Sequence, residues 1–394
     1  MIKKIKNINK TIITKLFFIK DGLLVINQPN EDKIYIGDKD SNLVANLNIH
    51  SQNLFKRIMK SGAIGFSEAY INSEISSPDI SKVIFLFSLN RRHNTNIIYG
   101  KKIYNYWNYF KHTLKANSVS GSKKNISYHY DLGNKFYEKW LDKSMTYSSA
   151  LFSNQNRDLI SGQENKYEHI CKITNIKKGD NILEIGCGWG GLAEYIAKKF
   201  QTKITCITLS NKQAEYVKKR VQKESLTDLI DVQICDYRSI NKKYDKIISI
   251  EMFEAVGKKY WPVFFQKLND NIKDNGIIGL QLISIKDDLY NSYKNNTDFI
   301  QKYIFPGGFL PSIYALKKVV VPFGFNMKIE KSFGKDYAHT LSIWKKSFLS
   351  SWNEISDDKI FDIKFKNMWE YYLAYCEAGF LSESTNVHQI TLKK

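Results

Sequence analysis

The sequence predicts an α/β protein in which a doubly wound, mostly parallel sheet fills the larger C-terminal part and a smaller α+β domain precedes it. Two observations support this prediction. Strand and helix patterns alternate from about residue 165 onward, which is typical of a parallel sheet covered by helices. In addition, 394 residues exceed one average domain and suffice for two, each with its own core.

The elements of the C-terminal part follow one another at short intervals. Apolar runs rich in Ile, Val and Thr predict strands, and apolar residues spaced three and four apart predict helices. The predicted strands cover residues 181–185, 203–208, 231–235, 246–249 and 276–283, and the predicted helices cover residues 191–200, 211–224 and 262–270.

The N-terminal part has a different texture. Residues 1–110 mix short apolar stretches with polar turns, which favours a small α+β domain. Residues 116–125 are small, polar and basic, so we predict a linker at 111–127 and a second domain at 128–394. Within the first domain we expect strands at 21–27 and 34–37, and helices near 52–60 and 79–89.

The charge of the chain points to an anionic partner. The formal net charge is +20, and residues 1–124 hold 20 Lys and Arg side chains against eight Asp and Glu. Such a surplus suits a membrane surface, a nucleic acid or an acidic substrate, although a genome biased toward Lys, Asn and Ile, or a plain solvated face, also produces it. The charge therefore supports a function without selecting it.

The cysteines and the apolar runs indicate the compartment. The five cysteines include no Cys-x-x-Cys pair, which argues against a zinc site and against a disulfide framework. The longest apolar run, 83–89, is too short to cross a bilayer, and lysines interrupt the N-terminal apolar stretch. We expect a cytoplasmic protein with neither a cleaved signal nor a transmembrane span, and no metal.

Residues 184–192, with the sequence EIGCGWGGL, predict a cofactor loop at the end of the first strand. The glycines at 186, 188 and 190 allow the backbone to approach a ligand closely. A nicotinamide enzyme would need a carboxylate at the end of the next strand, but residues 207–210 have none. Asp236 instead follows the strand after that, at the place where S-adenosylmethionine enzymes hold adenine. The pattern predicts an S-adenosylmethionine-dependent methyltransferase.

Seven segments of the chain, the glycine loop among them, form a longer pattern. They are YHYDLGN (128–134), MTYSSA (145–150), EIGCGWGGL (184–192), TLSNKQ (208–213), MFEAVG (252–257), KYIFPGG (302–308) and YYLAYC (371–376). In these segments and in their order the chain resembles the cyclopropane fatty acid synthases and the related mycolic acid methyltransferases. Residues 61–80 also look like the N-terminal lipid-interacting domain of the bacterial synthases, more weakly.

The resemblance implies transfer of a methyl(ene) group from S-adenosylmethionine to the cis double bond of a phospholipid acyl chain, giving a cyclopropane fatty acid. In those enzymes bicarbonate removes the proton that allows the ring to close. The implied partners are unsaturated acyl chains and the anionic inner face of the cytoplasmic membrane, to which the protein would bind peripherally; a homodimer is left open. Aromatic faces can steady the cationic intermediate, and the candidates are Tyr303, Phe305, Tyr337, Tyr371 and Tyr372.

The resemblance also assigns roles to individual residues. Glu254 would lie at the bicarbonate site, Ile283 would offer its backbone and Tyr337 its hydroxyl, while Cys376 falls on the active-site cysteine of the family. An alternative for Glu254 is a helix-capping acid, and for Cys376 an ordinary place in a closing helix. The implied cofactor-binding residues are Tyr147, Ser148, Glu184, Gly186, Cys187, Gly188, Trp189, Gly190, Leu192, Thr208, Leu209, Ser210, Gln213, Asp236 and Tyr237.

Two bicarbonate-site positions depart from the family pattern: Ser149 replaces a cysteine and Gln281 replaces a histidine. Both side chains can hydrogen-bond an anion, but glutamine cannot relay a proton. The product is then either a cyclopropane or, after a hydride shift, a methyl- or methylene-branched chain.

Three other functions compete with these. They are a small-molecule N- or O-methyltransferase, a non-catalytic lipid-binding protein that has kept the fold, and a nucleic-acid methyltransferase. The last is disfavoured because residues 249–254 read SIEMFE where an Asn/Asp-Pro-Pro-Tyr motif would be expected.

Overall fold

The computed structural model describes residues 13–14, 17–29, 33–93, 132–358 and 360–394. The predicted linker at 111–127 and the start of the 128–134 motif lie outside these residues. Two compact units are present, and neither is continuous in sequence. Unit 1 comprises Met1–His112, Ser292–Ile304 and Trp344–Ser384; unit 2 comprises Thr113–Asn291, Phe305–Ile343 and Thr385–Lys394. A boundary placed along the sequence does not anticipate this exchange of segments.

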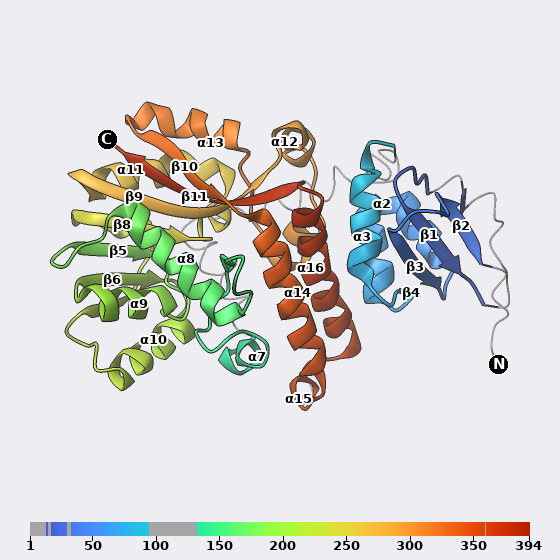
Figure 1. Cartoon of the computed structure of the whole chain (residues 1–394), viewed down its shortest axis with the longest axis horizontal. Helices are drawn as coiled ribbons and strands as arrows, with labels where there is room; N and C mark the ends of the chain where they lie inside the picture. Colours follow the sequence, from blue (N-terminus) through green and yellow to red (C-terminus); the bar gives the residue numbers. More distant parts are fainter. Residues whose placement is uncertain (1–12, 15–16, 30–32, 94–131, 359) are drawn as a thin grey trace. The chain divides into compact units, whose positions relative to one another are not determined.

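A seven-stranded sheet forms the centre of unit 2 (Figure 1). Its strand order is β10-β11-β9-β8-β5-β6-β7. The five strands from β9 to β7 in this order pair in parallel, while β11 pairs antiparallel with both β9 and β10. The doubly wound, mostly parallel sheet predicted from the sequence is thereby confirmed. Its strands are β5 (Asn181–Ile185), β6 (Lys203–Thr208), β7 (Ile230–Ile234), β8 (Tyr244–Ile250), β9 (Ile272–Ile285), β10 (Asn326–Ser332) and β11 (Thr385–Lys393).

Helices cover this sheet as the alternation predicts. Helices α8, α9 and α10 share one buried cluster with β5 and β6, and α11 packs against α13 (Figure 1). The helices are α7 (Asn134–Glu138), α8 (Leu159–Thr174), α9 (Gly191–Phe200), α10 (Asn211–Lys223), α11 (Trp261–Asn271), α12 (Asp287–Tyr293), α13 (Ile313–Val320) and α14 (Gly334–Ser350). Short turns join them: η2 (Tyr237–Ser239), η3 (Phe253–Ala255), η4 (Lys258–Tyr260) and η6 (Val321–Phe323).

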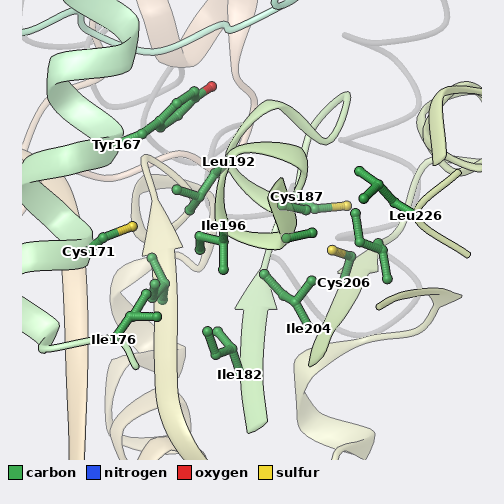
Figure 2. Packing of buried hydrophobic residues seen from close by; sticks show 14 of the residues in the cluster. Tyr167, Cys171, Ile176, Ile182, Cys187, Leu192, Ile196, Ile204, Cys206 and Leu226 are labelled. Carbon is green, nitrogen blue, oxygen red and sulfur yellow. The ribbon is translucent and has the colours of Figure 1, made fainter. Parts of the chain in front are cut away.

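A buried hydrophobic cluster in unit 2 packs against both ends of the glycine loop. Leu192 and Ile196 on α9 point into it together with Ile182 and Ile204 from the sheet, and Cys187 of the loop lies in the same cluster (Figure 2). All are at most 5% exposed. Because closely packed side chains leave little freedom, the two ends of the loop are held rigidly.

Unit 1 contains the predicted α+β part. Its sheet has the order β2-β1-β3-β4, with β1 antiparallel to β2 and parallel to β3. Helix α3 packs on β3, and α16 packs on α3 and α2. The elements are β1 (Leu23–Asn27), β2 (Ile34–Gly37), β3 (Val44–Ile49), α2 (Asn53–Ile71), β4 (Ile75–Ser76), α3 (Ile80–Leu89), η1 (Arg91–His93), the π-helical segment η5 (Ile300–Ile304), α15 (Trp352–Ser356) and α16 (Ile363–Leu381).

Helix α2 corrects one prediction, because it is longer than the segment 52–60 expected from the sequence. It extends to Ile71 and bends at Gly62, whose φ of 56° lies in the left-handed region. Glycine tolerates that conformation, so the chain resumes the helix after the bend. Gly62 therefore makes a kink within a longer helix.

Across the described parts of the chain, no helix combines the length and the apolar character needed to span a bilayer. Nor does any group of three or more His, Cys, Asp or Glu side chains in those same parts have an arrangement that could hold a metal ion.

Candidate active site

The glycine loop joins β5 to α9 through three left-handed residues. Gly186, Gly188 and Gly190 have φ values of 81°, 53° and 82°. A Cβ atom at Gly186 would lie 2.7 Å from Cγ of Met252, and one at Gly190 would lie 2.9 Å from Cγ1 of Val217. At Gly188, by contrast, it would meet nothing within 4 Å. The first and third glycines are therefore needed for packing, while the second borders open space that a cofactor can fill.

Polar residues at the end of β6 stand at the same edge as this loop. The N–H of Gly186 donates to the carbonyl of Ile207 at 2.9 Å, which ties the loop to β6. Ser210 caps α10 by accepting the N–H of Gln213 at 3.3 Å, and the hydroxyl of Thr208 donates to Oε1 of Gln213 at 2.8 Å. The segment 208–213 is thus positioned by its own hydrogen bonds, with Leu209 between them.

Asp236 and Tyr237 follow β7, the strand next to β6, at the same C-terminal edge of the sheet. Oδ1 of Asp236 accepts the N–H of Arg238 at 2.9 Å, and Oδ2 accepts Nη2 of Arg238 at 2.6 Å. The hydroxyl of Tyr237 is buried and has no hydrogen-bond partner among the described residues. Burial raises the pKa of this phenol to about 12. An unpaired buried hydroxyl is uncommon in folded proteins, and a ligand at this edge would satisfy it.

Aromatic rings border the loop near the 145–150 segment. Trp189 donates its indole N–H to Oδ1 of Asn134 at 2.9 Å, and its ring lies 4.9 Å from that of Tyr137. The ring of Tyr147 is 5.6 Å from the same tyrosine. Ser148 accepts a hydrogen bond from Nζ of Lys166 at 2.7 Å. The structure therefore brings the two predicted cofactor segments together through Tyr137.

Glu184, at the end of β5, is a buried carboxylate. It is 3% exposed, and its Oε2 lies 3.5 Å from Sγ of Cys206. Burial raises the pKa of Glu184 to about 8, against the opposing charge of Lys166. A buried acid with so few donors favours its protonated form.

We expect this burial to make unfolding depend on pH. Because the folded-state pKa lies above the ordinary value of 4.5, the contribution of Glu184 to stability is complete below that value and is lost as pH rises through about 8. Glu184→Gln should remove this component, a difference on the order of a few kcal/mol in the free energy of unfolding between pH 5 and 8. Urea midpoints across that range measure it.

The matched control is Glu164→Gln, an exposed glutamate on α8 that should follow the wild-type curve. Glu254 and Lys166 titrate in all three proteins, so only the difference between variants is informative. Parallel curves for wild type and Glu184→Gln would contradict the prediction.

A second group of polar residues surrounds Glu251, directly after β8. Oε1 of Glu251 accepts the backbone N–H of Ser149 at 2.9 Å and Nε2 of Gln281 at 2.7 Å. Its Oε2 accepts the hydroxyl of Tyr337 at 2.6 Å. The hydroxyl of Ser149 points elsewhere and donates to the carbonyl of Ala150 at 2.9 Å. Three of the predicted bicarbonate residues thus meet at one carboxylate of the chain itself.

Glu254 lies three residues further, in the turn η3. Its Oε1 accepts the backbone N–H of Ile283 at 2.5 Å, while its Oε2 is buried without a hydrogen-bond partner in the described part of the chain. Burial, together with the neighbouring charge of Glu251, raises the pKa of Glu254 to about 8. Glu254 therefore favours its protonated form at neutral pH.

Lys166 on α8 is the cation of this site. It is fully buried, and its Nζ donates to Ser148 as well as to Oε1 of Gln163 at 2.5 Å. Burial lowers the pKa of Lys166 to about 7, and the negative charges of Glu251, Asp142 and Glu184 oppose this. A charged group completely removed from water is retained only with such partners.

Among the remaining predicted residues, Phe305 belongs to unit 2, whereas Tyr303, Tyr371, Tyr372 and Cys376 belong to unit 1. Cys376 lies on α16, half-buried. Tyr371 is buried among the rings of Tyr70 and Phe299, at 5.7 and 4.9 Å. The hydroxyl of Tyr303 donates to Oε1 of Glu68 at 2.7 Å. These residues stay candidates by resemblance only.

Sequence reasoning missed Glu251 and Lys166. Glu251 was visible as an acid directly after a buried strand, at the carboxyl edge where parallel sheets place their sites. Lys166 left no such signal, because a lysine on an amphipathic helix is ordinarily exposed. Its burial became evident only when α8 was placed against the sheet.

Comparison with known proteins identifies the family. The family model for mycolic acid cyclopropane synthetase matches residues 117–390. Tuberculostearic acid methyltransferase of Mycobacterium tuberculosis is 32% identical over 349 residues, which cover 86% of this chain and 81% of that protein. Cyclopropane-fatty-acyl-phospholipid synthase of Escherichia coli strain K12 is 33% identical over 359 residues, 89% of this chain and 88% of that protein.

Solved structures give the same family. The cyclopropane synthase structure from Mycobacterium tuberculosis superposes with a TM-score of 0.65 at 26% identity, covering 69% of this chain and 98% of that one. A mycolic acid cyclopropane synthase complexed with SAH and CTAB gives 0.63 at 25% identity, with the same coverage. With its family model matched over more than half its length, this chain belongs to the mycolic acid cyclopropane synthetase family.

Proposed function

We propose that this protein is an S-adenosylmethionine-dependent methyltransferase that adds a methyl(ene) group to the cis double bond of unsaturated acyl chains in membrane phospholipids, with a cyclopropane fatty acid as product. One observation carries the proposal: the glycine loop and the buried carboxylates share one edge of the sheet. Met252, between Glu251 and Glu254, packs directly against Gly186 of the loop. The residues for binding a methyl donor and for handling a proton are therefore adjacent.

The cofactor loop fits S-adenosylmethionine, which supplies an electrophilic methyl group when bound. Gly188 borders open space, and the buried hydroxyl of Tyr237 has no partner among the described residues. We propose that these two residues contact the cofactor, with Asp236 held in place by Arg238. The mycolic acid cyclopropane synthase solved with SAH and CTAB supports S-adenosylmethionine as the cofactor.

The carboxylates fit an alkene substrate. An alkene is a weak nucleophile, and the cation that methylation leaves must be kept from water until a proton departs. We propose that the carboxyl groups of Glu251 and Glu254, three residues apart, handle that proton. The cyclopropane-fatty-acyl-phospholipid synthase of Escherichia coli, 33% identical, supports an acyl-chain substrate.

A methyl- or methylene-branched chain is the second candidate product. It is favoured by the changes among the residues predicted to hold bicarbonate. Gln281 stands where the family has a histidine, and the hydroxyl of Ser149 donates to the carbonyl of Ala150. After a hydride shift, the positive charge lies on a different carbon. The base must then remove the proton from a different position than it does during ring closure. The 32% identity to tuberculostearic acid methyltransferase also supports branching.

We further propose that the protein is cytoplasmic and binds peripherally to the inner face of the cytoplasmic membrane, with residues 1–110 as a lipid-interacting domain and 128–394 as the catalytic domain. A pocket of about 320 Å³ in unit 1 supports this, because Lys20, Arg91, Arg92 and His93 all line it. The net charge of +20 has the sign that anionic headgroups attract.

Expression in a bacterial host that lacks its own synthase tests the function. We expect monounsaturated phospholipid chains to gain the mass of one CH₂ group, measured by mass spectrometry of extracted lipids. Proton NMR then separates the products, because cyclopropane protons resonate at high field and methylene protons in the olefinic region. An inactive control is Gly188→Val, argued below. Unchanged lipids in cells that contain folded protein able to bind S-adenosylmethionine would contradict the acyl substrate.

A further inference from the structure

The residues predicted to hold bicarbonate do not fit it, because this chain already occupies their donors. The N–H of Ser149, Nε2 of Gln281 and the hydroxyl of Tyr337 all donate to the carboxylate of Glu251, at 2.9, 2.7 and 2.6 Å. The fourth donor, the N–H of Ile283, is bonded to Glu254. Bicarbonate and carboxylate present similar oxygens to such donors, so one excludes the other.

Gln281 is oriented for this carboxylate. Its Oε1 accepts a hydrogen bond from Nε2 of Gln389 at 2.9 Å. Nε2 of Gln389 also donates to the carbonyl of Lys166 at 3.2 Å, and Oε1 of Gln389 accepts from Nδ1 of His169 at 2.5 Å. Because the oxygen of Gln281 is engaged on this side, the amide presents its nitrogen to Glu251. Gln281, which replaces the histidine of the family pattern, is thus oriented to donate a hydrogen bond to the carboxylate of Glu251.

The backbone at Glu251 is also unusual. Its φ of 49° lies in the left-handed region, where glycine is the ordinary residue and other residues are strained. Its N–H donates to the carbonyl of Gln281 at 2.8 Å, which holds the strand ends together. A strained residue that aims a carboxylate into a polar site is a reason to look for a function.

The two neighbouring carboxyl groups have different environments. Burial raises the pKa of both, but Glu251 receives three hydrogen bonds and the charge of Lys166, all of which favour its ionised form. Glu254 receives one backbone hydrogen bond and faces the charge of Glu251. Environments that separate two carboxyl groups in this way assign one as acid and the other as base.

We propose that Glu251 is the built-in general base of the reaction, in the place that bicarbonate takes in the cyclopropane synthases that this chain resembles. This inference rests on the proposed function. After methyl transfer, a C–H bond of the new methyl group breaks and its electron pair closes the ring on the cationic carbon, or forms a C=C bond after a hydride shift. The proton goes to Glu251 and then to water. Neither route needs an oxidant or a reductant.

Dependence on bicarbonate tests the proposal. The full-length protein is assayed with vesicles of monounsaturated phosphatidylglycerol and S-adenosylmethionine, in buffer freed of carbon dioxide and again with added bicarbonate. Methylated lipid and SAH are both quantified. We expect wild-type turnover to be the same in both buffers. Glu251→Gln keeps the shape but loses the base and should lower turnover about 10²–10⁴-fold in either buffer.

A second variant makes the test sharper. Glu251→Gly removes the carboxylate, relieves the left-handed strain and frees the donors of Ser149, Gln281 and Tyr337, so its activity should depend on added bicarbonate. Its matched control is Glu383→Gly, an exposed glutamate that also has a left-handed φ, of 55°, and should behave as wild type.

Two outcomes would overturn the proposal: wild type that needs bicarbonate, or Glu251→Gln that turns over like wild type without it. Both leave the methyltransferase function standing. If wild type instead yields no methylated lipid in either buffer, the proposed function itself fails. Calorimetric titration with S-adenosylmethionine shows that each variant is folded and binds its cofactor.

Discussion

Gly188→Val is expected to weaken binding of S-adenosylmethionine by at least about 100-fold, or about 2.7 kcal/mol. A side chain at this position enters the open space beside the glycine loop, because a Cβ there meets no protein atom within 4 Å. The loss comes from exclusion of the cofactor. Since the protein itself is not crowded there, stability should fall only by the cost of a left-handed non-glycine residue, roughly 1–2 kcal/mol.

Calorimetric titration and thermal unfolding separate these two effects. The control is Gly324→Val, because Gly324 has a φ of 75° and a Cβ there also meets nothing within 4 Å, but it lies in the turn after η6. Both variants should lose similar stability, and only Gly188→Val should lose affinity. Equal affinity in the two variants would remove the glycine loop from the cofactor site.

Tyr337→Phe is expected to shift the acid limb of the pH profile of kcat/KM upward by about 1–2 pH units, because it removes a hydrogen bond to ionised Glu251 worth about 1.5–3 kcal/mol. The lost bond disfavours the carboxylate and so raises the pKa of Glu251. Turnover at a fixed pH on that limb should fall about tenfold for each unit of the shift. The other charged groups facing Glu251, which are Lys166 and Glu254, are retained.

The shift distinguishes two roles of Tyr337. Loss of a hydrogen bond to Glu251 moves the acid limb, whereas a packing defect would lower kcat/KM by the same factor at every pH. Tyr195→Phe is the control: its hydroxyl accepts Nζ of Lys199 at 2.9 Å on α9, away from Glu251, and its profile should match wild type. A Tyr337→Phe profile with the wild-type acid limb would show that Glu251 does not titrate in the reaction.

Local pattern sufficed for most of the fold. The strands predicted at 181–185 and 203–208 are present with those bounds, and the helix predicted at 191–200 is α9. Alternation of apolar strands and amphipathic helices is a short-range property, so it can be seen in the sequence. The exchange of segments 292–304 and 344–384 into unit 1 could not be seen, because it depends on which helix faces pack together.

The same distinction between short-range pattern and long-range packing applies to the candidate site. The glycine loop was predictable because left-handed turns require glycine, and the three left-handed values at Gly186, Gly188 and Gly190 follow directly. Gln281 and Ser149 were also recognised as departures from the family pattern. Their consequence was not predictable from sequence, because a substitution by itself does not show what the new side chain contacts.

By itself, then, the sequence determined the α/β class, the glycine loop and the positions at which this chain differs from its family, since each depends on residues within a few positions of one another. Only the tertiary structure decided that Glu251 takes the donors of Ser149, Gln281 and Tyr337. Those donors lie 102, 30 and 86 residues away in the chain and meet one carboxylate only when the sheet, the segment before α8 and α14 are in place. Hydrogen bonds act over a few ångströms in space, whatever the separation in sequence.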